Sequence, residues 1–308
     1  MREHSRAQKI SLKGQVAVVT GGGRGIGRAI AQALAAAGAS VAVLARSADE
    51  LAQTVKLIMS AGGLAHAFRI DVTESGAVQH TFVEIERTLG SVEVLVNNAA
   101  TPGLFGPFWT TDVDEWWRAM DVNLRGQLLC TRAVLPEMIA RRRGRIVNVA
   151  SGAGAMAIPY LSGYVTSKTA LVRFTECLAT ETREFGISVF AIQPGTVRTA
   201  MSEYSLNSEE GKKWLPWFRR IFDEGLDVPP QRPAQFVLEL ASGKADALSG
   251  RFLTVSDDLD AILKEVAEVE KGELYLLRLR KLAGQGQNPV ATMIAAAAQR
   301  PAAKGDKR

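Results

Sequence analysis

Two residues suited to proton transfer, Tyr164 and Lys168, lie four positions apart and follow Ser151 in the sequence. Residues four apart share one face of a helix, so the Lys168 ammonium can lie beside the Tyr164 phenol. A cation about 4 Å from a phenol, at an effective dielectric of about 20, favours phenolate by roughly 4 kcal/mol, or about three pKa units. Such a phenol can exchange a proton with an alcohol or ketone. Alone, the pair is more typical of a solvated helix face, so the surrounding elements decide between the two interpretations.

A glycine-rich turn, Thr20-Gly-Gly-Gly-Arg-Gly-Ile-Gly27, lies between a predicted strand and a predicted helix. Glycines there permit a tight turn and close approach of the backbone to a pyrophosphate, whose charge meets the N–H groups at the helix end. A Walker loop is excluded because no Gly-Lys-Ser/Thr follows. The turn therefore predicts dinucleotide binding, with contacts from Thr20, Gly21, Arg24, Gly25, Ile26 and Gly27.

The end of the second predicted strand bears on the choice of cofactor. An acid at this place would bind the ribose 2′-OH of NAD, whereas this chain has Arg46 and Ser47 there. A guanidinium can bind a 2′-phosphate with two hydrogen bonds, and Arg24 is a second candidate cation. In the alternative, Arg46 is merely solvated and Asp49 or Glu50 binds the ribose, but a capping box with Ser47 already accounts for Glu50. The sequence predicts NADP(H) in preference to NAD(H), with NAD(H) possible.

Strand-like runs alternate with helical periodicity over the first two thirds of the chain. This alternation, with near-continuous apolar strands, predicts an α/β fold: one doubly wound, Rossmann-type parallel sheet of about seven strands, covered by helices on both faces. We expect strands at residues 16–20, 40–45, 65–70, 92–97, 145–149 and 188–193, and helices at 25–37, 48–61, 75–89, 114–140 and 163–185.

The pattern becomes irregular after residue 193. Residues 200–228 indicate an irregular excursion or short helices, after which a helix at 232–241 and a strand at 251–255 return to the sheet. Two further helices are expected at 258–270 and 273–282. The predicted organisation is a flexible N-terminus at 1–11, a Rossmann-type domain at 12–256, a helical extension at 257–283 and a disordered tail at 284–308.

The turn and the Tyr-x-x-x-Lys pair together resemble the motifs of the short-chain dehydrogenase/reductase family, over residues 12–255. Further motifs in the same order are Asp71-Val72, Asn97-Asn-Ala-Ala100, Asn123, Ser151 thirteen residues before Tyr164, and Pro194-Gly-Thr-Val-Arg-Thr199. Two places depart from the family pattern. Ala100 replaces the usual Gly, and Val255-Ser-Asp-Asp258 stands where many members end in Gly-Gly, with about fifty residues following here.

The resemblance implies hydride transfer between a nicotinamide and a carbonyl or secondary alcohol. Tyr164 would protonate the oxygen, and Ser151 would donate a hydrogen bond to it as negative charge develops. The family pattern implies that Lys168 also holds the nicotinamide ribose, and that Asn123 holds a water linking Lys168 to solvent. The implied cofactor contacts beyond the turn are Arg46, Ser47, Asp71, Val72, Asn98, Ala99, Tyr164, Lys168, Pro194, Gly195, Val197 and Thr199.

Charge and composition exclude several other functions. The net charge of +5 belongs to the chain ends, since residues 1–13 and 284–308 each carry +3 and the body between them about −1, which argues against a nucleic-acid-binding face. Cys130 and Cys177 indicate buried thiols in a reducing compartment, and the three histidines have no metal-ligand spacing. We expect no metal, no membrane span, a cytoplasmic location and, by resemblance, a homodimer or homotetramer built on helices 114–140 and 163–185.

The substrate is a small molecule that the sequence specifies weakly. Aromatic and apolar side chains in two loops could line an apolar pocket for a bulky ketone or alcohol, or could instead pack the loops onto the core: Leu104, Phe105, Phe108, Trp109, Trp214, Trp217 and Phe218. Trp116 and Trp117 are expected to be structural. Two alternative functions stay open, a catalytically silent NADP-binding regulatory protein and an NADP-dependent epimerase or dehydratase on the same fold.

Overall fold

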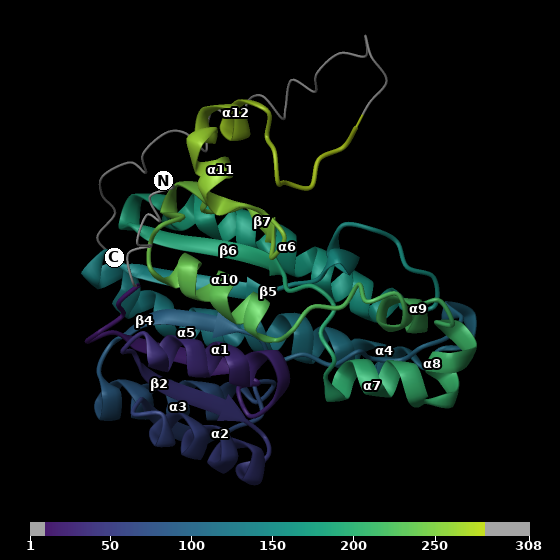
Figure 1. The fold of residues 1–308 in the computed structure, drawn as a ribbon, viewed down its shortest axis with the longest axis horizontal. Coiled ribbons are helices and arrows are strands. Elements are labelled where there is room, and N and C mark those ends of the chain that lie inside the picture. The colour runs from purple at the N-terminus through teal and green to yellow at the C-terminus, as the bar shows by residue number, and fades with distance from the viewer. Residues whose placement is uncertain (1–9, 281–308) are drawn as a thin grey trace, which may run out of the picture.

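Seven parallel strands form one sheet in the computed structural model, which describes residues 10–280 (Figure 1). The strand order is β3-β2-β1-β4-β5-β6-β7, so the predicted Rossmann-type sheet is confirmed. The predicted strand limits hold to within two residues. The strands are β1 Val16–Thr20, β2 Ser40–Ala45, β3 Leu64–Arg69, β4 Val92–Asn97, β5 Gly144–Val149, β6 Ile187–Gln193 and β7 Phe252–Thr254.

The direction of winding reverses between β1 and β4, which pair with each other although five elements separate them in sequence. In an open parallel sheet, such a switch point leaves a crevice at the carboxyl ends of the strands, where ligands bind. The loops after β1, β4 and β5, which carry the predicted functional motifs, all leave the sheet on this side. The topology therefore brings residues far apart in sequence to one edge.

Helices cover both faces of the sheet and create two separate cores (Figure 1). α1, α2 and α10 bury their apolar stripes on one face, and α3, α5 and α6 on the other. No helix within residues 10–280 is long and apolar enough to cross a bilayer. The helices are α1 Gly25–Ala36, α2 Ala48–Ser60, α3 Ser75–Leu89, α4 Val113–Met120, α5 Gly126–Arg141, α6 Ser162–Thr182, α7 Ala200–Asn207, α8 Glu209–Trp214, α9 Phe218–Asp223, α10 Gln231–Ala241, α11 Leu259–Lys264 and α12 Val266–Lys271.

Three helix predictions need correction. The helix expected at 114–140 is divided into α4 and α5 by a π-helical turn at Asp121–Arg125, and the one expected at 258–270 is divided at Glu265. The helix expected at 273–282 is wrong for its described part. Glu273 and Tyr275 have φ of 48° and 60°, and the Tyr275 carbonyl accepts a hydrogen bond from the Phe252 N–H of β7. The predicted tail at 284–308 and residues 1–9 of the predicted N-terminal segment lie outside the described residues.

A buried polar network joins the centre of the sheet to α5 and α6. Asn97 Nδ2 on β4 donates to Thr131 Oγ1 and to Asn148 Oδ1, both at 2.9 Å, and Asn148 Nδ2 on β5 donates to Thr175 Oγ1 at 2.8 Å. All four side chains are buried. Because an unpaired buried polar group is costly, this network fixes where the two helices lie on the sheet.

Replacement of Asn148 by alanine tests this network. Asn148→Ala leaves one Asn97 hydrogen and the Thr175 oxygen without their partner, so we expect the free energy of unfolding to fall by about 1–3 kcal/mol. Urea denaturation measures the change, with Asn207→Ala as the control because Asn207 is exposed and bonds only to Glu203. Equal stability of the two variants would show that the network contributes nothing.

Candidate active site

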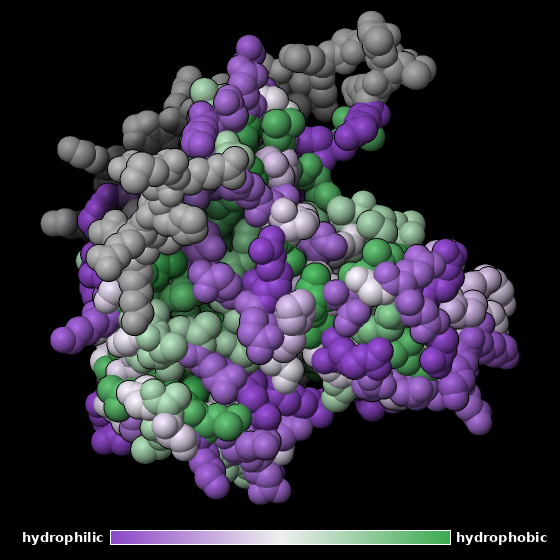
Figure 2. Space-filling view, viewed as in Figure 1, coloured by the Kyte–Doolittle hydropathy of each residue, from purple (hydrophilic) through white to green (hydrophobic). Residues whose placement is uncertain are grey.

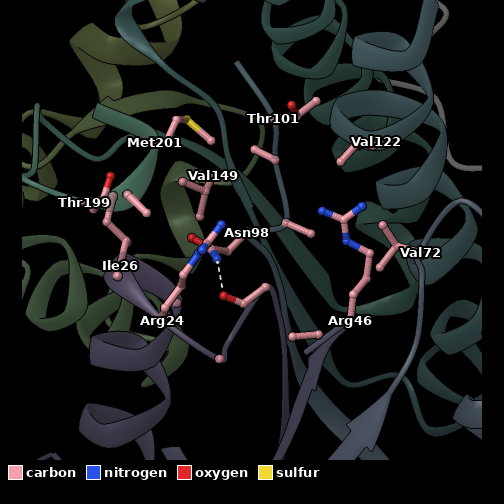
Figure 3. A pocket seen from close by; sticks show the side chains of 18 of the residues that line it. Arg24, Ile26, Arg46, Val72, Asn98, Thr101, Val122, Val149, Thr199 and Met201 are labelled. Atoms are coloured by element: carbon pink, nitrogen blue, oxygen red, sulfur yellow. Dashed lines mark hydrogen bonds between the residues drawn. The ribbon is translucent and has the colours of Figure 1, made fainter. Parts of the chain in front are cut away.

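A cleft of about 560 Å³ lies at the carboxyl ends of the strands, at the switch point. Figure 3 shows Arg24 and Arg46 toward one end of this cleft and Thr101 and Met201 toward the other. The cleft brings together most of the site residues predicted from the sequence. These are Gly21, Arg24, Gly25, Ile26, Gly27, Arg46, Ser47, Asp71, Val72, Asn98, Ala99, Tyr164, Lys168, Pro194 and Thr199.

The glycine-rich turn has the shape that a pyrophosphate requires. Gly21 and Gly25 adopt φ of 62° and 54°, and a Cβ added to Gly27 would lie 2.3 Å from the Gly21 carbonyl oxygen. The first turn of α1 has no acidic residue, and no side chain caps its N–H groups. These N–H groups and the positive end of the helix dipole therefore face the cleft free to bind an anion. The turn fits the diphosphate of a dinucleotide.

Thr20 and Asn98 hold this turn against the end of β4. Thr20 Oγ1 accepts hydrogen bonds from the N–H groups of Asn98 and Ala99, at 2.9 and 3.0 Å. Asn98 Nδ2 donates to the carbonyls of Thr20 and Gly21, at 3.0 and 3.2 Å. Thr20 is buried, so we assign it the role of a brace for the turn, whereas Asn98 both braces the turn and lines the cleft.

Arginines and carboxylates meet at one end of the cleft. Arg46 Nη1 lies 3.9 Å from Asp71 Oδ2, and Arg24 Nη1 lies 3.1 Å from Glu50 Oε1. Both arginine side chains are mainly exposed, 77% for Arg46 and 61% for Arg24, so these ion pairs hold them weakly. The predicted capping box is half formed: Ser47 Oγ accepts from the Glu50 N–H at 3.3 Å, but the Glu50 carboxylate turns to Arg24.

Tyr164 and Lys168 are brought to the cleft by α6, on the same face of the helix. Lys168 Nζ donates to the Val149 carbonyl at 2.7 Å and lies 5.8 Å from the centre of the Tyr164 ring. Burial lowers the pKa of Lys168 to about 7. It also raises the pKa of Tyr164, and a hydrogen bond with Ser151 opposes that rise. The expectation that Lys168 brings the phenol pKa below its usual value is therefore wrong for this structure, because desolvation of the buried phenol has the largest effect on its pKa.

Ser151 lies two residues after the end of β5 and precedes a short 3₁₀ turn, Gly152–Gly154. Its hydroxyl oxygen accepts from the Ala153 N–H at 3.2 Å, which leaves the hydroxyl hydrogen available for another partner. Tyr164 is the side chain with which it shares a hydrogen bond. The two hydroxyl groups therefore lie together beside the cleft.

Asn123 lies in the π-helical turn, fully buried. Its side chain accepts from the Thr101 N–H at 2.8 Å and donates to the Thr101 carbonyl and to Ser167 Oγ, at 2.9 and 3.0 Å. Ser167 in turn donates to the Tyr164 carbonyl at 2.7 Å. Both amide hydrogens of Asn123 are thus used by protein groups, and the residue ties the loop after β4 to the first turn of α6.

Several residues that line the cleft were not predicted from the sequence. Thr101 and Met201 are immediate neighbours of predicted motifs, so the motif limits alone hid them. Arg118 and Val122 lie four apart on the helix expected at 114–140, a spacing that could have identified one face turned to the cleft. Conversely, the predicted Gly195 and Val197 are not part of the lining; Gly195 has φ of 74°, and Val197 is buried.

The aromatic residues considered for a substrate pocket divide into two groups. Phe105 is buried with Leu161 and Leu215, and Trp214, Phe218 and Tyr164 pack against them. In contrast, Phe108, Trp109 and Trp217 are exposed; Figure 2 shows apolar surface among charged side chains over α7–α9. Trp116 donates from Nε1 to Ser162 Oγ at 3.0 Å and so joins α4 to α6.

Comparison with known proteins agrees with the fold and the cleft. The family described as short chain dehydrogenase matches residues 15–210. A short chain dehydrogenase from Pseudocercospora fijiensis is 34% identical over 279 residues, covering 87% of this chain and 90% of that protein. A Beutenbergia cavernae protein crystallised with NADP at low occupancy is 32% identical with a TM-score of 0.73, covering 80% and 97% of the two chains. A variant of actinorhodin polyketide ketoreductase solved with NADPH is 33% identical with the same TM-score, covering 81% and 97%.

The chain belongs to the short-chain dehydrogenase/reductase family. It is thereby an NAD(P)-binding oxidoreductase of the class that acts on alcohols and ketones.

The buried lysine predicts a specific pH dependence of stability. The pKa of Lys168 is about 7 in the folded chain and about 10.4 in the unfolded chain. Between these values the unfolded chain binds more protons, so the stability contributed by this group is complete above pH 10 or so and is lost as the pH falls toward about 7. The difference in unfolding free energy between wild type and Lys168→Met should rise by about 1.4 kcal/mol per pH unit between about pH 8 and 9.5. Chemical denaturation over this range measures it, and parallel curves would contradict the lowered pKa.

Proposed function

We propose that the protein is an NADP(H)-dependent oxidoreductase that interconverts a carbonyl and a secondary alcohol by reversible hydride transfer. The observation that carries this proposal is the hydrogen-bonded pair of Tyr164 and Ser151 at a cleft whose other end is a glycine-rich anion cradle. Tyr164 lines the cleft that also holds the anion cradle, and Ser151 lies beside it, so this hydroxyl pair is suited to bind and protonate an oxygen there. When bound, the nicotinamide supplies or accepts the hydride.

The turn from Gly21 to Gly27 would hold the diphosphate through its N–H groups, and Val72 and Val122 would flank the adenine. Lys168 would bind the nicotinamide ribose as well as the Val149 carbonyl, since an ammonium has three hydrogens to donate. All of these residues line the cleft, which supports these assignments, and the family resemblance supports the contact of Lys168 with the ribose.

The proton chemistry depends on Tyr164 and Ser151. Because burial raises its pKa, the Tyr164 phenol is protonated near neutrality and can act as an acid. Ser151 donates a hydrogen bond to the carbonyl oxygen as negative charge develops there. The O–H bond of Tyr164 then breaks and its proton passes to that oxygen, giving the alcohol. In the reverse direction the Tyr164 phenolate accepts the proton of the alcohol oxygen, so the same residues serve both directions.

Asn123 would support this step by holding the first turn of α6 in place through Ser167. A water near Asn123 that connects Lys168 to solvent stays a prediction from the family resemblance. For the substrate, the aromatic cluster of Phe105, Trp214 and Phe218 against Tyr164 favours a bulky, mainly apolar carbonyl compound.

The preference for NADP(H) follows from Arg46 and Arg24. Their carboxylate partners, Asp71 and Glu50, bind them weakly, so a 2′-phosphate could recruit either guanidinium. Two relatives of similar fold carry NADP or NADPH, which supports the same choice.

Replacement of Tyr164 by phenylalanine tests the acid. Tyr164→Phe keeps the ring but removes the proton donor, so we expect turnover to fall by about 10²–10⁴-fold while NADPH binding is kept. Nicotinamide absorbance measures turnover with NADPH and NADH against aliphatic, aromatic and polycyclic ketones, and tryptophan fluorescence measures binding. Retained turnover in the variant would disprove the role of Tyr164. A wild-type protein that binds NADPH but reduces none of the ketones would favour the silent NADP-binding alternative.

Replacement of Arg46 by aspartate tests the cofactor choice. Arg46→Asp places a carboxylate where the 2′-phosphate would lie, so we expect the NADPH/NADH affinity ratio to fall by roughly 10–100-fold, the value of one or two charged hydrogen bonds. Fluorescence titration with both cofactors gives the ratio. Arg46→Lys keeps the charge but not the paired donors, so its NADPH/NADH affinity ratio should lie between those of the wild type and Arg46→Asp. An unchanged ratio in Arg46→Asp would rule out the assignment.

A further inference from the structure

Residues 272–280, here called the strap, leave α12 and cross the free edge of the sheet (Figure 1). The Phe252 N–H of β7 donates to the Tyr275 carbonyl at 2.9 Å, and Arg251 Nη1 donates to the Leu274 carbonyl at 3.2 Å. Since β7 is the last strand of the sheet, the strap covers backbone groups that an edge strand exposes. Residues 15–210, which the short chain dehydrogenase family description matches, end before the strap.

Two arginines fasten the strap to α6. Arg278 forms a two-pronged pair with Glu176, Nη2 to Oε1 at 2.6 Å and Nη1 to Oε2 at 3.2 Å, and its Nε donates to Glu273 at 2.8 Å. Arg173, on α6, donates to the Leu277 carbonyl at 2.6 Å. Bidentate arginine–carboxylate pairs fix the orientation of the two side chains as well as the distance between them. The strap is therefore held on α6 at two successive residues.

Leu277 lies between these fastenings and packs into a small apolar cluster distinct from the two main cores. The cluster consists of Ala150, Leu171, Val172 and Ala191, each at most 4% exposed. Leu277 is partly buried and packs against this cluster, and among the described residues it is the cluster's one neighbour from beyond β7. The strap thus places one apolar side chain against the cluster that joins the sheet to α6.

This cluster borders the candidate catalytic residues. Ala150 directly precedes Ser151, and Leu171 follows Lys168 by about one helical turn. The loop after Ser151 rests on α6 without spare room, because a Cβ added to Gly154 would lie 3.0 Å from the Lys168 carbonyl oxygen. Any shift of the cluster therefore changes how Ser151 faces α6.

We propose that Leu277 is a positioning residue for the reaction: it holds the end of β5 against α6 and thereby fixes Ser151 relative to Tyr164 and Lys168. The inference rests on the proposed function of that site. Leu277 does not line the cleft, so it acts through Ala150 and α6 and not on the substrate. A shift of about 1 Å in a catalytic group can lower a rate by about 10²-fold, so a small relaxation is sufficient.

Leu277→Ala removes the side chain that packs against the cluster, and Leu279→Ala is the matched control because Leu279 lies on the same strap but is 84% exposed. We expect kcat to fall by about tenfold or more in Leu277→Ala, with the NADPH dissociation constant unchanged. Leu277→Met, which fills a similar volume, should recover most of the loss. Hydrogen exchange should become faster in residues 149–155 and 162–172 of Leu277→Ala only.

A strap that merely covers the sheet edge would give a different result. Leu277→Ala would then lose thermal stability, but kcat measured well below the unfolding temperature would equal that of Leu279→Ala, which overturns the inference and leaves the proposed function intact. Unchanged hydrogen exchange in residues 149–155 overturns it as well, whatever the activity. A wild-type protein without turnover refutes the proposed function and, with it, a positioning role in the reaction.

Discussion

One buried hydrogen bond, from the Lys168 ammonium to the Val149 carbonyl at 2.7 Å, is the contact on which the active site depends. It joins α6 to the carboxyl end of β5, and so determines how Tyr164 faces Ser151, which lies two residues beyond Val149. The cost is desolvation, which lowers the pKa of Lys168 to about 7. Because an amine donates hydrogen bonds in both its protonation states, this link persists when the charge of Lys168 changes.

The cofactor end of the cleft depends on a similar link between distant segments. Thr20 and Asn98 connect the glycine-rich turn to the end of β4 through four hydrogen bonds. The Thr20 hydroxyl accepts two of them from the backbone after β4, and the Asn98 amide donates the other two to the backbone of the turn. The link crosses the switch point, where β1 and β4 pair. The turn therefore stays open toward the cleft while its glycines remain fixed, as tight binding of a diphosphate requires.

Local signals in the sequence were sufficient for most of the fold, and long-range contacts account for the errors. The buried strands were predictable because each is a short apolar run bounded by turn residues, as in Val16–Thr20. The π-helical turn was not, because it depends on Asn123 bonding to the loop at Thr101. The strap has helical periodicity but follows the edge of β7 instead, where Phe252 binds it. The motifs were sufficient to predict the position of the cleft. They were not sufficient to predict the direction in which the Tyr164 pKa shifts, because that shift depends mainly on burial and not on sequence spacing.

Burial couples the charges of Tyr164 and Lys168 in a way that spacing alone cannot reveal. A neutral phenol with a neutral amine holds as many protons as a phenolate with an ammonium, and desolvation favours the neutral form of each. With its pKa near neutrality, Lys168 responds to any charge placed in the cleft. An anionic ligand there favours the ammonium, and the ammonium in turn favours phenolate. The strength of Tyr164 as an acid or a base is thus set by what the cleft holds, so a bound dinucleotide both completes the site and adjusts its proton chemistry.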